Sequence, residues 1–182
     1  MIIGLTGKNA AGKGEVANYL KSKDFVYYSL SDVIRGKATK MGIGHSRDNL
    51  IKLGNELRAK SGPSFLAKEI IKKIKKQMGK NFVVDSIRNT YEVKELTKIK
   101  GFVLIGIDAP VELRFKRLLE RNRLGDAKTI EEFKKQEQRE NLKSDTNQQL
   151  DATFKMAKRI IVNDGSLEEL HKKIDKLIKG LG

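Results

Sequence analysis

The stretch GLTGKNAAGKGEVANYL, residues 4–20, contains the pattern G-x-x-x-x-G-K, whose fixed residues are Gly7, Gly12 and Lys13. A loop of this composition between a strand and a helix directs successive main-chain N–H groups at an anion, and the helix start adds about half a positive charge. The pattern therefore predicts a loop that binds the phosphates of ATP, with the Lys13 ammonium at the β- and γ-phosphates.

The segments on either side of the loop have the structure that this mechanism requires. Ile2–Thr6 is a short apolar run typical of a buried parallel strand. After Gly12, the apolar residues Val16 and Leu20 recur at helical spacing. The residues expected to contact the nucleotide here are Gly7, Lys8, Asn9, Ala10, Ala11, Gly12, Lys13, Gly14 and Glu15.

Gly14 departs from the usual pattern, in which a Ser or Thr follows the lysine and its hydroxyl contacts Mg²⁺. Without that hydroxyl, the ion has to rely on phosphate oxygens, water and a more distant carboxylate, which Mg²⁺ accepts because it keeps several waters. Asp85 is the candidate carboxylate, because it ends an apolar strand at the edge where ligands of α/β sheets bind. No residue is expected to ligate Mg²⁺ directly.

Composition limits the class of protein. The chain has 182 residues, no Cys and 2 His, which excludes disulfides, thiolate chemistry and His-rich metal sites. No run approaches the roughly 20 apolar residues of a membrane span, and no signal peptide precedes the first strand, so a cytoplasmic protein is expected. The net charge of +15 favours an anionic partner such as a nucleotide, RNA or anionic lipid, or else reflects a lysine-rich or heat-adapted surface.

Four further apolar runs are predicted as strands: Phe25–Tyr28, Phe82–Val84, Phe102–Ile107 and Ile160–Val162. Helical patterns separate them, beginning near residue 29 and then covering about 46–60, 64–78, 91–98, 111–122, 130–142, 151–159 and 167–177. This alternation predicts an α/β fold of the P-loop NTPase type, with a five-stranded parallel sheet covered by helices on both faces. We expect one domain over residues 1–182, with an acceptor-binding region at about 29–80 and a small helical lid at about 117–147.

Several motifs resemble those of a known superfamily. GKNAAGKG (7–14) resembles the loop of adenylate kinase and related nucleoside monophosphate kinases, which also carry G-K-G. SLSDVIR (29–35) looks like the start of their substrate-binding helix, and VVDSIRN (83–89) resembles their D-G-F-P-R stretch without its proline. RLLERNRLGD (117–126) is similar to the start of their arginine-bearing lid.

Three other segments point to particular branches of that superfamily. IIVNDGSLEEL (160–170) resembles the C-terminal segment of dephospho-CoA kinases, near the adenine of ATP. RDNLIKLGNELRAKSGPSFLA (47–67) and KTIEEFKKQEQRE (128–140) look closest to a largely archaeal family of adenylate-kinase-like and dephospho-CoA-kinase-like proteins.

The resemblance implies roles for further residues. Asp32 and Arg35 would face the acceptor nucleotide, and Arg88 would pair with a phosphate. Arg121 and Arg123 would belong to the lid. Asn163, Asp164 and Gly165 would lie near the adenine.

Some of these positions keep a second interpretation from the residues themselves. Arg58 could add an acceptor-phosphate contact, or it could be an ordinary cation at a helix C-terminus. Asp32 could contact a sugar hydroxyl, or it could be an acidic residue favoured by the helix dipole. The lysines at 72, 73, 75, 76 and 80 are expected to form a solvated helix face, and they are also the best candidates for an RNA contact.

Together these features predict an ATP- and Mg²⁺-dependent kinase, in which Lys13, Asp85 and Arg121 act on the transferred phosphoryl group by positioning and electrostatics. The arginines favour a nucleoside or deoxynucleoside monophosphate as the acceptor. Dephospho-CoA, whose hydroxyl would profit from a carboxylate base, is the alternative acceptor. A nucleotide-gated RNA-binding or assembly ATPase is a hypothesis from a different functional class.

Overall fold

The computed structural model describes residues 1–182 except 78, 123–124, 140, 142–143 and 182. Its strands are β1 (Ile2–Thr6), β2 (Val26–Ser29), β3 (Phe82–Asp85), β4 (Phe102–Asp108) and β5 (Arg159–Val162). They form one parallel sheet in the order β2-β3-β1-β4-β5. The predicted five-stranded parallel sheet is therefore confirmed.

The helices alternate with these strands along the chain, as the apolar patterns indicate. They are α1 (Lys13–Ser22), α2 (Leu30–Lys40), α3 (Arg47–Ser61), α4 (Phe65–Lys75), α5 (Thr90–Leu96), α6 (Val111–Arg121), α7 (Ile130–Arg139), α8 (Leu150–Lys155) and α9 (Leu167–Lys179).

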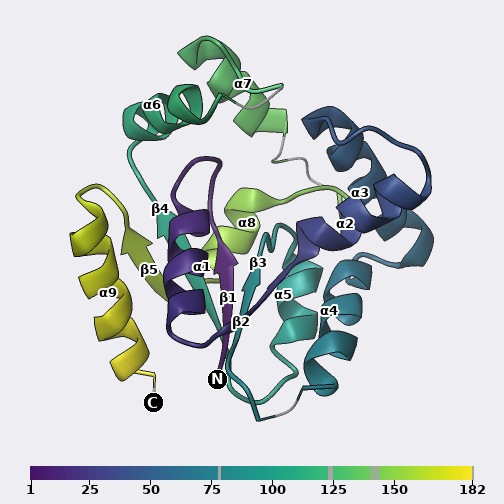
Figure 1. The fold of residues 1–182 in the computed structure, drawn as a ribbon. Coiled ribbons are helices and arrows are strands. Elements are labelled where there is room, and N and C mark those ends of the chain that lie inside the picture. Colours follow the sequence, from purple (N-terminus) through teal and green to yellow (C-terminus); the bar gives the residue numbers. More distant parts are fainter. Residues whose placement is uncertain (78, 123–124, 140, 142–143, 182) are drawn as a thin grey trace.

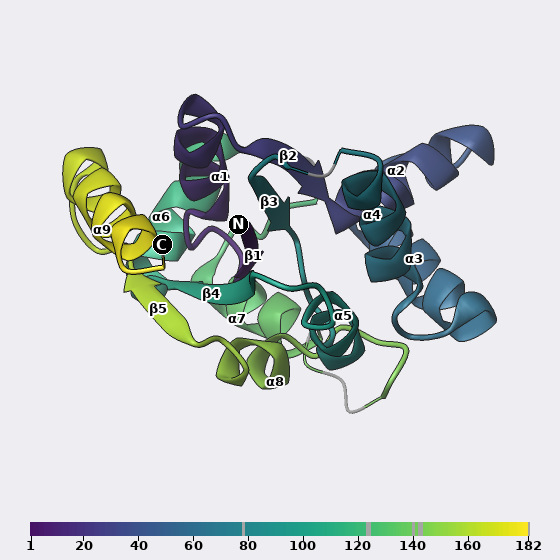
Figure 2. The ribbon, with the colours of Figure 1, turned by 90° about the horizontal axis from the view of Figure 1, so that it is seen from below.

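Helices cover both faces of the sheet, and successive residues of a strand pack against opposite layers (Figures 1 and 2). In β1, Ile3 and Leu5 pack with α1 and α9, where Leu20 and Leu170 belong to the same core cluster. Ile2 belongs to a second cluster together with residues of α2, α3, α4 and α5. Because both faces are buried, the strand reads as an uninterrupted apolar run.

The strand order places a crevice at the carboxyl end of β1. The chain leaves β1 through α1 toward β2 and β3 on one side, and then crosses to β4 and β5 on the other side. In open α/β sheets this reversal of direction leaves a gap in which ligands bind. Helices α6 and α7 stand beyond the same sheet edge and share a small core of Leu118, Ala127 and Phe133, while both chain ends lie at the opposite edge (Figure 1).

Several predicted helices end earlier than the sequence pattern indicates; α4, for example, was expected to about residue 78 and ends at Lys75. The helix expected over about 151–159 ends at Lys155, because the main-chain N–H of Lys158 already donates to the oxygen of Leu104 in β4 at 3.1 Å. Helix α7, expected over about 130–142, is described as far as Arg139, and residues 140 and 142 lie outside the described part of the chain. Within the described part of the chain, no helix combines the length and apolarity that a membrane span needs.

Candidate functional site

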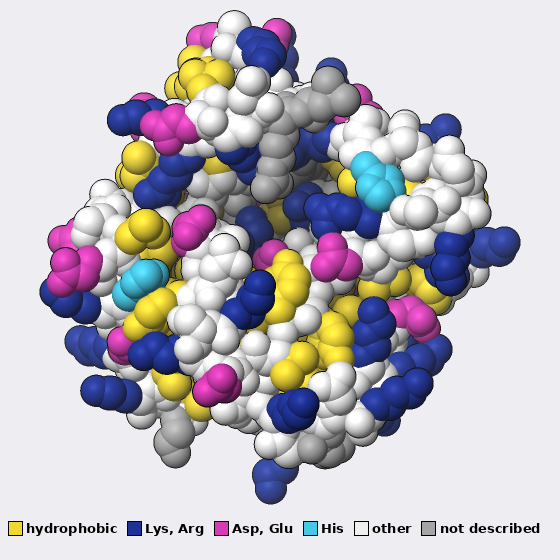
Figure 3. Space-filling model, in the orientation of Figure 1, with side chains coloured by type: hydrophobic (Ala, Val, Ile, Leu, Met, Phe, Trp, Pro, Cys, Tyr) yellow, Lys and Arg dark blue, Asp and Glu magenta, His cyan; other side chains and the backbone are white. Residues whose placement is uncertain are grey.

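A cleft of about 940 Å³ opens at the carboxyl edge of the sheet, between the loop after β1, helices α2 and α3, and the region of α6. Its volume lies within the range of about 300–1,000 Å³ that is typical of small-molecule sites. Figure 3 shows the hollow on this face of the molecule, with Lys and Arg side chains gathered around it. The cleft is therefore a cationic site at the position where α/β sheets bind ligands.

The glycine-rich loop (residues 7–14) needs its glycines for two close approaches. A Cβ atom on Gly7 would lie 2.1 Å from the main-chain oxygen of Ile107, and one on Gly12 would lie 2.1 Å from Nδ2 of Asn163. Both glycines also have positive φ angles, 146° and 102°, and Ala10 between them has φ 58°. The main chain thus curls into a tight nest beside the N-terminus of α1, as a phosphate-binding loop does.

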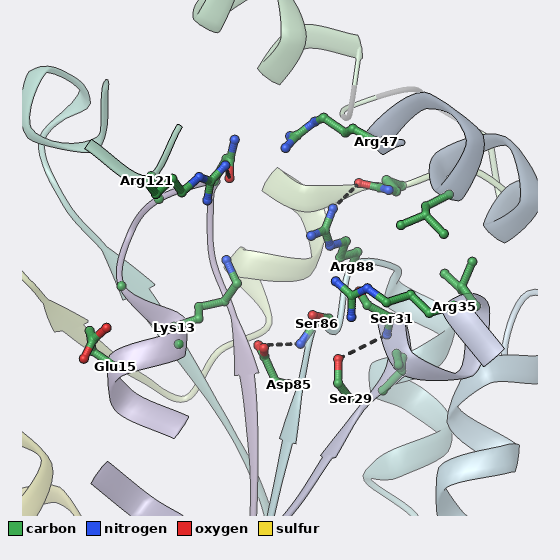
Figure 4. Close-up of a pocket in the computed structure, with 18 of the residues that line it drawn as sticks. Lys13, Glu15, Ser29, Ser31, Arg35, Arg47, Asp85, Ser86, Arg88 and Arg121 are labelled. Carbon is green, nitrogen blue, oxygen red and sulfur yellow. Dashed lines mark hydrogen bonds between the residues drawn. The ribbon is translucent and has the colours of Figure 1, made fainter. Parts of the chain in front are cut away.

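Lys13 is the first residue of α1, and its ammonium folds back over the glycine-rich loop. Its Nζ donates hydrogen bonds to the main-chain oxygens of Gly7 at 2.7 Å and Lys8 at 2.9 Å. Figure 4 shows the side chain reaching into the cleft. The Lys13 ammonium therefore already lies beside the loop, where it could bond a phosphate bound there.

The other loop residues divide into two groups. Asn9, Ala10, Gly12, Gly14 and Glu15 line the cleft with Lys13. Gly7, Lys8 and Ala11 are not among its lining residues. Gly7 packs on β4, Ala11 is fully buried, and the Lys8 ammonium lies 3.9 Å from the Asp151 carboxylate.

Asp85 lies at the end of β3, on the floor of the cleft. One carboxylate oxygen accepts from the main-chain N–H of Ser86 at 2.5 Å, and the other accepts from the Tyr27 hydroxyl at 3.4 Å. Burial, with the neighbouring Asp85 charge as the second cause, raises the pKa of Tyr27 to about 12. Tyr27 is therefore a neutral donor to this carboxylate at physiological pH.

Three arginines from different elements point into the half of the cleft that faces the glycine-rich loop. Arg35 comes from α2, Arg47 from the first turn of α3, and Arg88 from the loop between β3 and α5 (Figure 4). Arg88 donates to Oε1 of Gln148 at 3.1 Å. The predicted residues Arg35 and Arg88 are thus brought together, and Arg47 joins them without having been predicted.

Asp32 pairs with Arg35, since its carboxylate accepts from Nη1 of Arg35 at 2.6 Å. Both side chains are partly exposed, and Asp32 is not among the residues that line the cleft. The structure therefore presents Asp32 as a partner of Arg35 on the rim of the site.

Arg58 forms a buried ion pair rather than an open phosphate contact. Its side chain is 2% exposed and donates through Nε and Nη2 to Oε1 of Glu92, at 2.9 and 2.8 Å, while Glu92 is 0% exposed. The other oxygen of Glu92 accepts from the main-chain N–H groups of Arg88 and Asn89, which caps α5. Arg58 borders the cleft, but its charge is neutralised by Glu92. Through Glu92, Arg58 helps to position the loop that carries Arg88.

The arginines of α6 and its surroundings are held at the glycine-rich loop. Arg121 donates to both oxygens of Asp126, at 2.9 and 2.8 Å, and to Oδ1 of Asn9 at 3.0 Å. Arg114, which sequence reasoning missed, is buried and donates to the main-chain oxygen of Asn9 and to the Glu137 carboxylate of α7. Arg123, predicted to act in the lid, lies outside the described residues.

Asn163 connects the loop after β5 to the glycine-rich loop. Its side chain donates to the main-chain oxygen of Ala11 at 3.0 Å, and its main-chain oxygen accepts from Arg117 at 3.1 Å. Gly165 also lines the cleft. Asp164 is not among the lining residues. Its carboxylate pairs with Lys173 at 2.9 Å, and a hydrogen bond from Lys173 lowers the pKa of Asp164.

Many lining residues were not predicted, because no local pattern marks them. Arg47 is one of many basic residues in the chain, Gln148 reaches Arg88 from a segment 60 residues away, and Ser86 has no distinctive spacing. Among the described residues, no three His, Asp or Glu side chains gather closely enough to hold a metal ion by themselves.

The chain is similar in sequence to a described domain family and to proteins of other organisms. A family model described as AAA domain matches residues 6–134. A UPF0200 protein of Sulfurisphaera tokodaii is 32% identical over 180 residues, with 98% of this chain and 96% of that protein covered. A UPF0200/UPF0201 protein of Archaeoglobus fulgidus is 33% identical over 181 residues, 97% of this chain, which spans only 54% of that longer relative.

Solved structures share the fold. TT1252 from Thermus thermophilus superposes with a TM-score of 0.66 at 21% identity, covering 100% of this chain and 98% of the other. A shikimate kinase from Acinetobacter baumannii in complex with shikimate superposes with a TM-score of 0.58 at 16% identity, covering 98% and 93%. At these identities the likeness concerns the fold, which is that of P-loop kinases.

Proposed function

The chain belongs to the UPF0200 family and has a P-loop kinase-like fold, and from this premise we propose that it transfers the γ-phosphoryl group of ATP to a nucleoside or deoxynucleoside monophosphate. One observation carries the proposal. A single cleft has the glycine-rich loop with Lys13 on one side and the guanidinium groups of Arg35, Arg47 and Arg88 on the other. A site built in this way suits two phosphate-bearing ligands that meet between its halves.

The donor half accounts for ATP. The main-chain nest and the α1 N-terminus hold the phosphates, and Lys13 exchanges its hydrogen bonds to loop oxygens for bonds to the β- and γ-phosphates. The nucleotide base lies at the far end, near Arg117, Asn163 and Gly165, all of which line the cleft. Arg121 is close enough to the loop to stabilise charge on the transferred group, because it already contacts Asn9.

The residues present also fit Mg²⁺ bound through ATP and water. Gly7 and Gly12 leave no room for a Cβ against Ile107 and Asn163, which keeps the loop tightly curled, and Asp85 offers a buried carboxylate in the same cleft. When bound, Mg²⁺ neutralises part of the triphosphate charge and holds its oxygens in a fixed geometry. Asp85, steadied by Tyr27 and by the main chain of Ser86, would hold waters of this ion.

The acceptor half favours an acceptor that is already anionic. Arg35, Arg47 and Arg88 converge there, whereas the nearby Asp32 is paired with Arg35 and does not line the cleft. A phosphate acceptor needs cationic clamps and no general base, while a hydroxyl acceptor profits from a free carboxylate. Apolar side chains of Ile34, Leu50, Ile51 and Leu66 on the same side suit the flat face of a base.

The experiment is a phosphoryl-transfer panel with ATP and Mg²⁺, testing each ribo- and deoxyribonucleoside monophosphate and dephospho-CoA, with product identified by mass. We expect a diphosphate product from at least one monophosphate and no product with the Lys13→Ala variant. Transfer to dephospho-CoA alone would replace the proposed acceptor class. ATP binding without transfer to any member would leave a nucleotide-binding module and contradict the kinase proposal.

The basic surface supports a second candidate, a nucleotide-gated RNA-binding ATPase. The lysines of α4 are exposed apart from local contacts such as Lys72 with Glu69, and they contribute to the net charge of +15. RNA binding that weakens steeply with salt and survives Lys13→Ala would favour this candidate. Absence of RNA binding at moderate salt would exclude this second candidate function.

A further inference from the structure

Ser86 has a main-chain conformation that side-chain-bearing residues rarely adopt. Its φ angle is 62°, and the other described non-glycine residues with positive φ are Ala10, Asp24 and Asn122. Ser86 comes directly after Asp85, lines the cleft, and is 9% exposed. Such outliers tend to persist where surrounding contacts fix them, and they concentrate at functional sites.

The chain around Ser86 is anchored to β1, from which the glycine-rich loop emerges. The Thr6 hydroxyl donates to the main-chain oxygen of Ile87 at 2.9 Å, and the Ile87 N–H donates to the oxygen of Leu5 at 3.3 Å. The Ser86 N–H donates to the Asp85 carboxylate. The position of the Ser86 side chain relative to the loop is thus set by the sheet itself.

The Ser86 hydroxyl makes no hydrogen bond within the described part of the chain, and it is not one of the fully buried side-chain atoms there that lack a partner, which are Nδ2 of Asn9 and Oε1 of Gln136. The other buried hydroxyls behave differently: Thr6 donates to Ile87, Thr153 donates to Gln149, and Ser29 accepts from the N–H of Ser31. A hydroxyl that can be reached from the cleft and is bonded to no group of the described chain is available to a ligand there, as donor or as acceptor.

The hydroxyl lies where the two halves of the site meet. Figure 4 shows Ser86 beside Asp85, with Lys13 on one side and Arg88 on the other. The glycine-rich loop lacks the hydroxyl that commonly contacts Mg²⁺, because Gly14 stands at that position and no atom lies within 4 Å of where its Cβ would be. Ser86 brings a hydroxyl oxygen into the same cleft from the end of the neighbouring strand β3.

We propose that the Ser86 hydroxyl is an oxygen donor to the hydrated Mg²⁺ of bound Mg–ATP and takes the place of the hydroxyl missing at Gly14. The proposal rests on the proposed function in that ATP must bind at the glycine-rich loop. It does not depend on which acceptor is phosphorylated. Asp85 and Ser86 would then form one metal-facing edge at the end of β3, in keeping with the preference of Mg²⁺ for oxygen ligands and retained waters.

The test is calorimetric binding of a non-hydrolysable ATP analogue, with Mg²⁺ and with EDTA, to the wild type, Ser86→Gly and Ser86→Ala. Glycine removes the hydroxyl and accepts positive φ, whereas alanine removes the hydroxyl and keeps the conformational strain. We expect Mg²⁺ to tighten binding to the wild type, and both variants to lose about 10-fold of that tightening. In EDTA the three proteins should bind alike.

Two further variants separate the hydroxyl from the backbone. Asp24→Gly relieves a φ of 64° at a site remote from the cleft, so it should keep the full Mg²⁺ effect. Gly14→Ser, combined with Ser86→Gly, should restore part of the Mg²⁺ effect by returning a hydroxyl to the loop. The melting temperature of Ser86→Gly should be no lower than that of the wild type, which would exclude partial unfolding as the cause.

Equal Mg²⁺-dependent tightening in the wild type and both Ser86 variants would overturn this proposal and leave the proposed function standing. Weaker binding of the variants in EDTA to the same extent as with Mg²⁺ would also overturn it, because the effect would then be one of loop geometry. Failure of the wild type to bind the analogue under either condition would instead overturn the proposed function itself.

Discussion

The Asn163 side-chain amide donates to the main-chain oxygen of Ala11 at 3.0 Å, across 152 positions of sequence. The same Nδ2 occupies the space that a Cβ on Gly12 would need. Arg117 holds Asn163 from the other side, through its main-chain oxygen. The loop after β5 therefore braces the glycine-rich loop.

Replacing Asn163 by Ala should loosen the glycine-rich loop and weaken ATP binding by about 10-fold, with a stability loss of roughly 1–3 kcal/mol from the unsatisfied buried oxygen of Ala11. Calorimetry and thermal unfolding measure the two effects. Glu168→Ala, which removes an exposed ion pair with Lys172 on α9, is the control and should change neither. Unchanged ATP affinity in Asn163→Ala would show that the brace is dispensable.

A matched pair of substitutions within the glycine-rich loop tests its close packing. Gly12→Ala forces a side chain onto φ 102° and into Asn163, so we expect roughly 1–3 kcal/mol of destabilisation and loss of ATP binding. Gly14→Ala meets open space in the first turn of α1 and should stabilise the fold by at most about 1 kcal/mol. Chemical denaturation measures the stability of both variants, and calorimetry measures their ATP binding. Similar results for the two variants would contradict the close contact at Gly12 and the open space at Gly14.

The buried pair of Arg58 and Glu92 gives a stability prediction that separates the two interpretations of Arg58. Arg58→Ala leaves a buried carboxylate without its partner and should cost about 3–5 kcal/mol of unfolding free energy. The double variant with Glu92→Gln should recover part of this loss, because the charge is removed. A variant Arg58→Ala with wild-type stability but impaired acceptor binding would instead support the acceptor-phosphate contact that the sequence analysis left open for Arg58.

The fold could be predicted from the sequence because its signals are local. Buried parallel strands such as Ile2–Thr6 read as apolar runs, and the glycines of the loop mark a turn that only a few residues can make. The local pattern predicted the end of α8 too late in the sequence. The main-chain N–H of Lys158 donates a hydrogen bond to the oxygen of Leu104 in β4, a contact that no local pattern indicates.

The site was less predictable, because the role of each charged side chain depends on partners that can lie far away in the sequence. Arg35, Arg58 and Arg88 look equivalent as residue types, yet one pairs with Asp32, one is buried against Glu92, and one contacts Gln148. Pairings between residues as far as 60 positions apart leave no periodic pattern in the sequence. The structure is needed to tell a guanidinium that faces a ligand from one that holds the scaffold.

Tyr27 gives a prediction for alkaline pH. Its pKa is raised to about 12, chiefly by burial and then by Asp85, so the folded state favours the neutral phenol. Stability from this group is complete below the ordinary tyrosine pKa near 10 and is lost as pH rises toward 12. The melting temperature of the wild type should therefore fall more steeply than that of Tyr27→Phe between pH 10 and 12. Parallel curves would show that Tyr27 titrates normally.

Arg121 is held in the cleft by Asn9 and by both oxygens of Asp126, which is 6% exposed on its side chain. If it acts on the transferred phosphoryl group, its removal should affect the transition state more than the ground state. Arg121→Ala should lower kcat by about 10²–10³-fold with the acceptor that the panel identifies, while ATP affinity changes by less than about three-fold.

Arg121→Lys tests the geometry of this contact, because a single ammonium cannot reproduce the two-point bond to Asp126 together with the contact to Asn9. It should recover little of the lost kcat, since the positive charge would no longer be fixed at the loop. Arg139→Ala, an exposed arginine at the end of α7, is the matched control and should keep wild-type rates. Loss of ATP affinity with kcat unchanged in Arg121→Ala would instead make Arg121 a uniform ATP contact, because such a contact stabilises the bound ground state and the transition state alike.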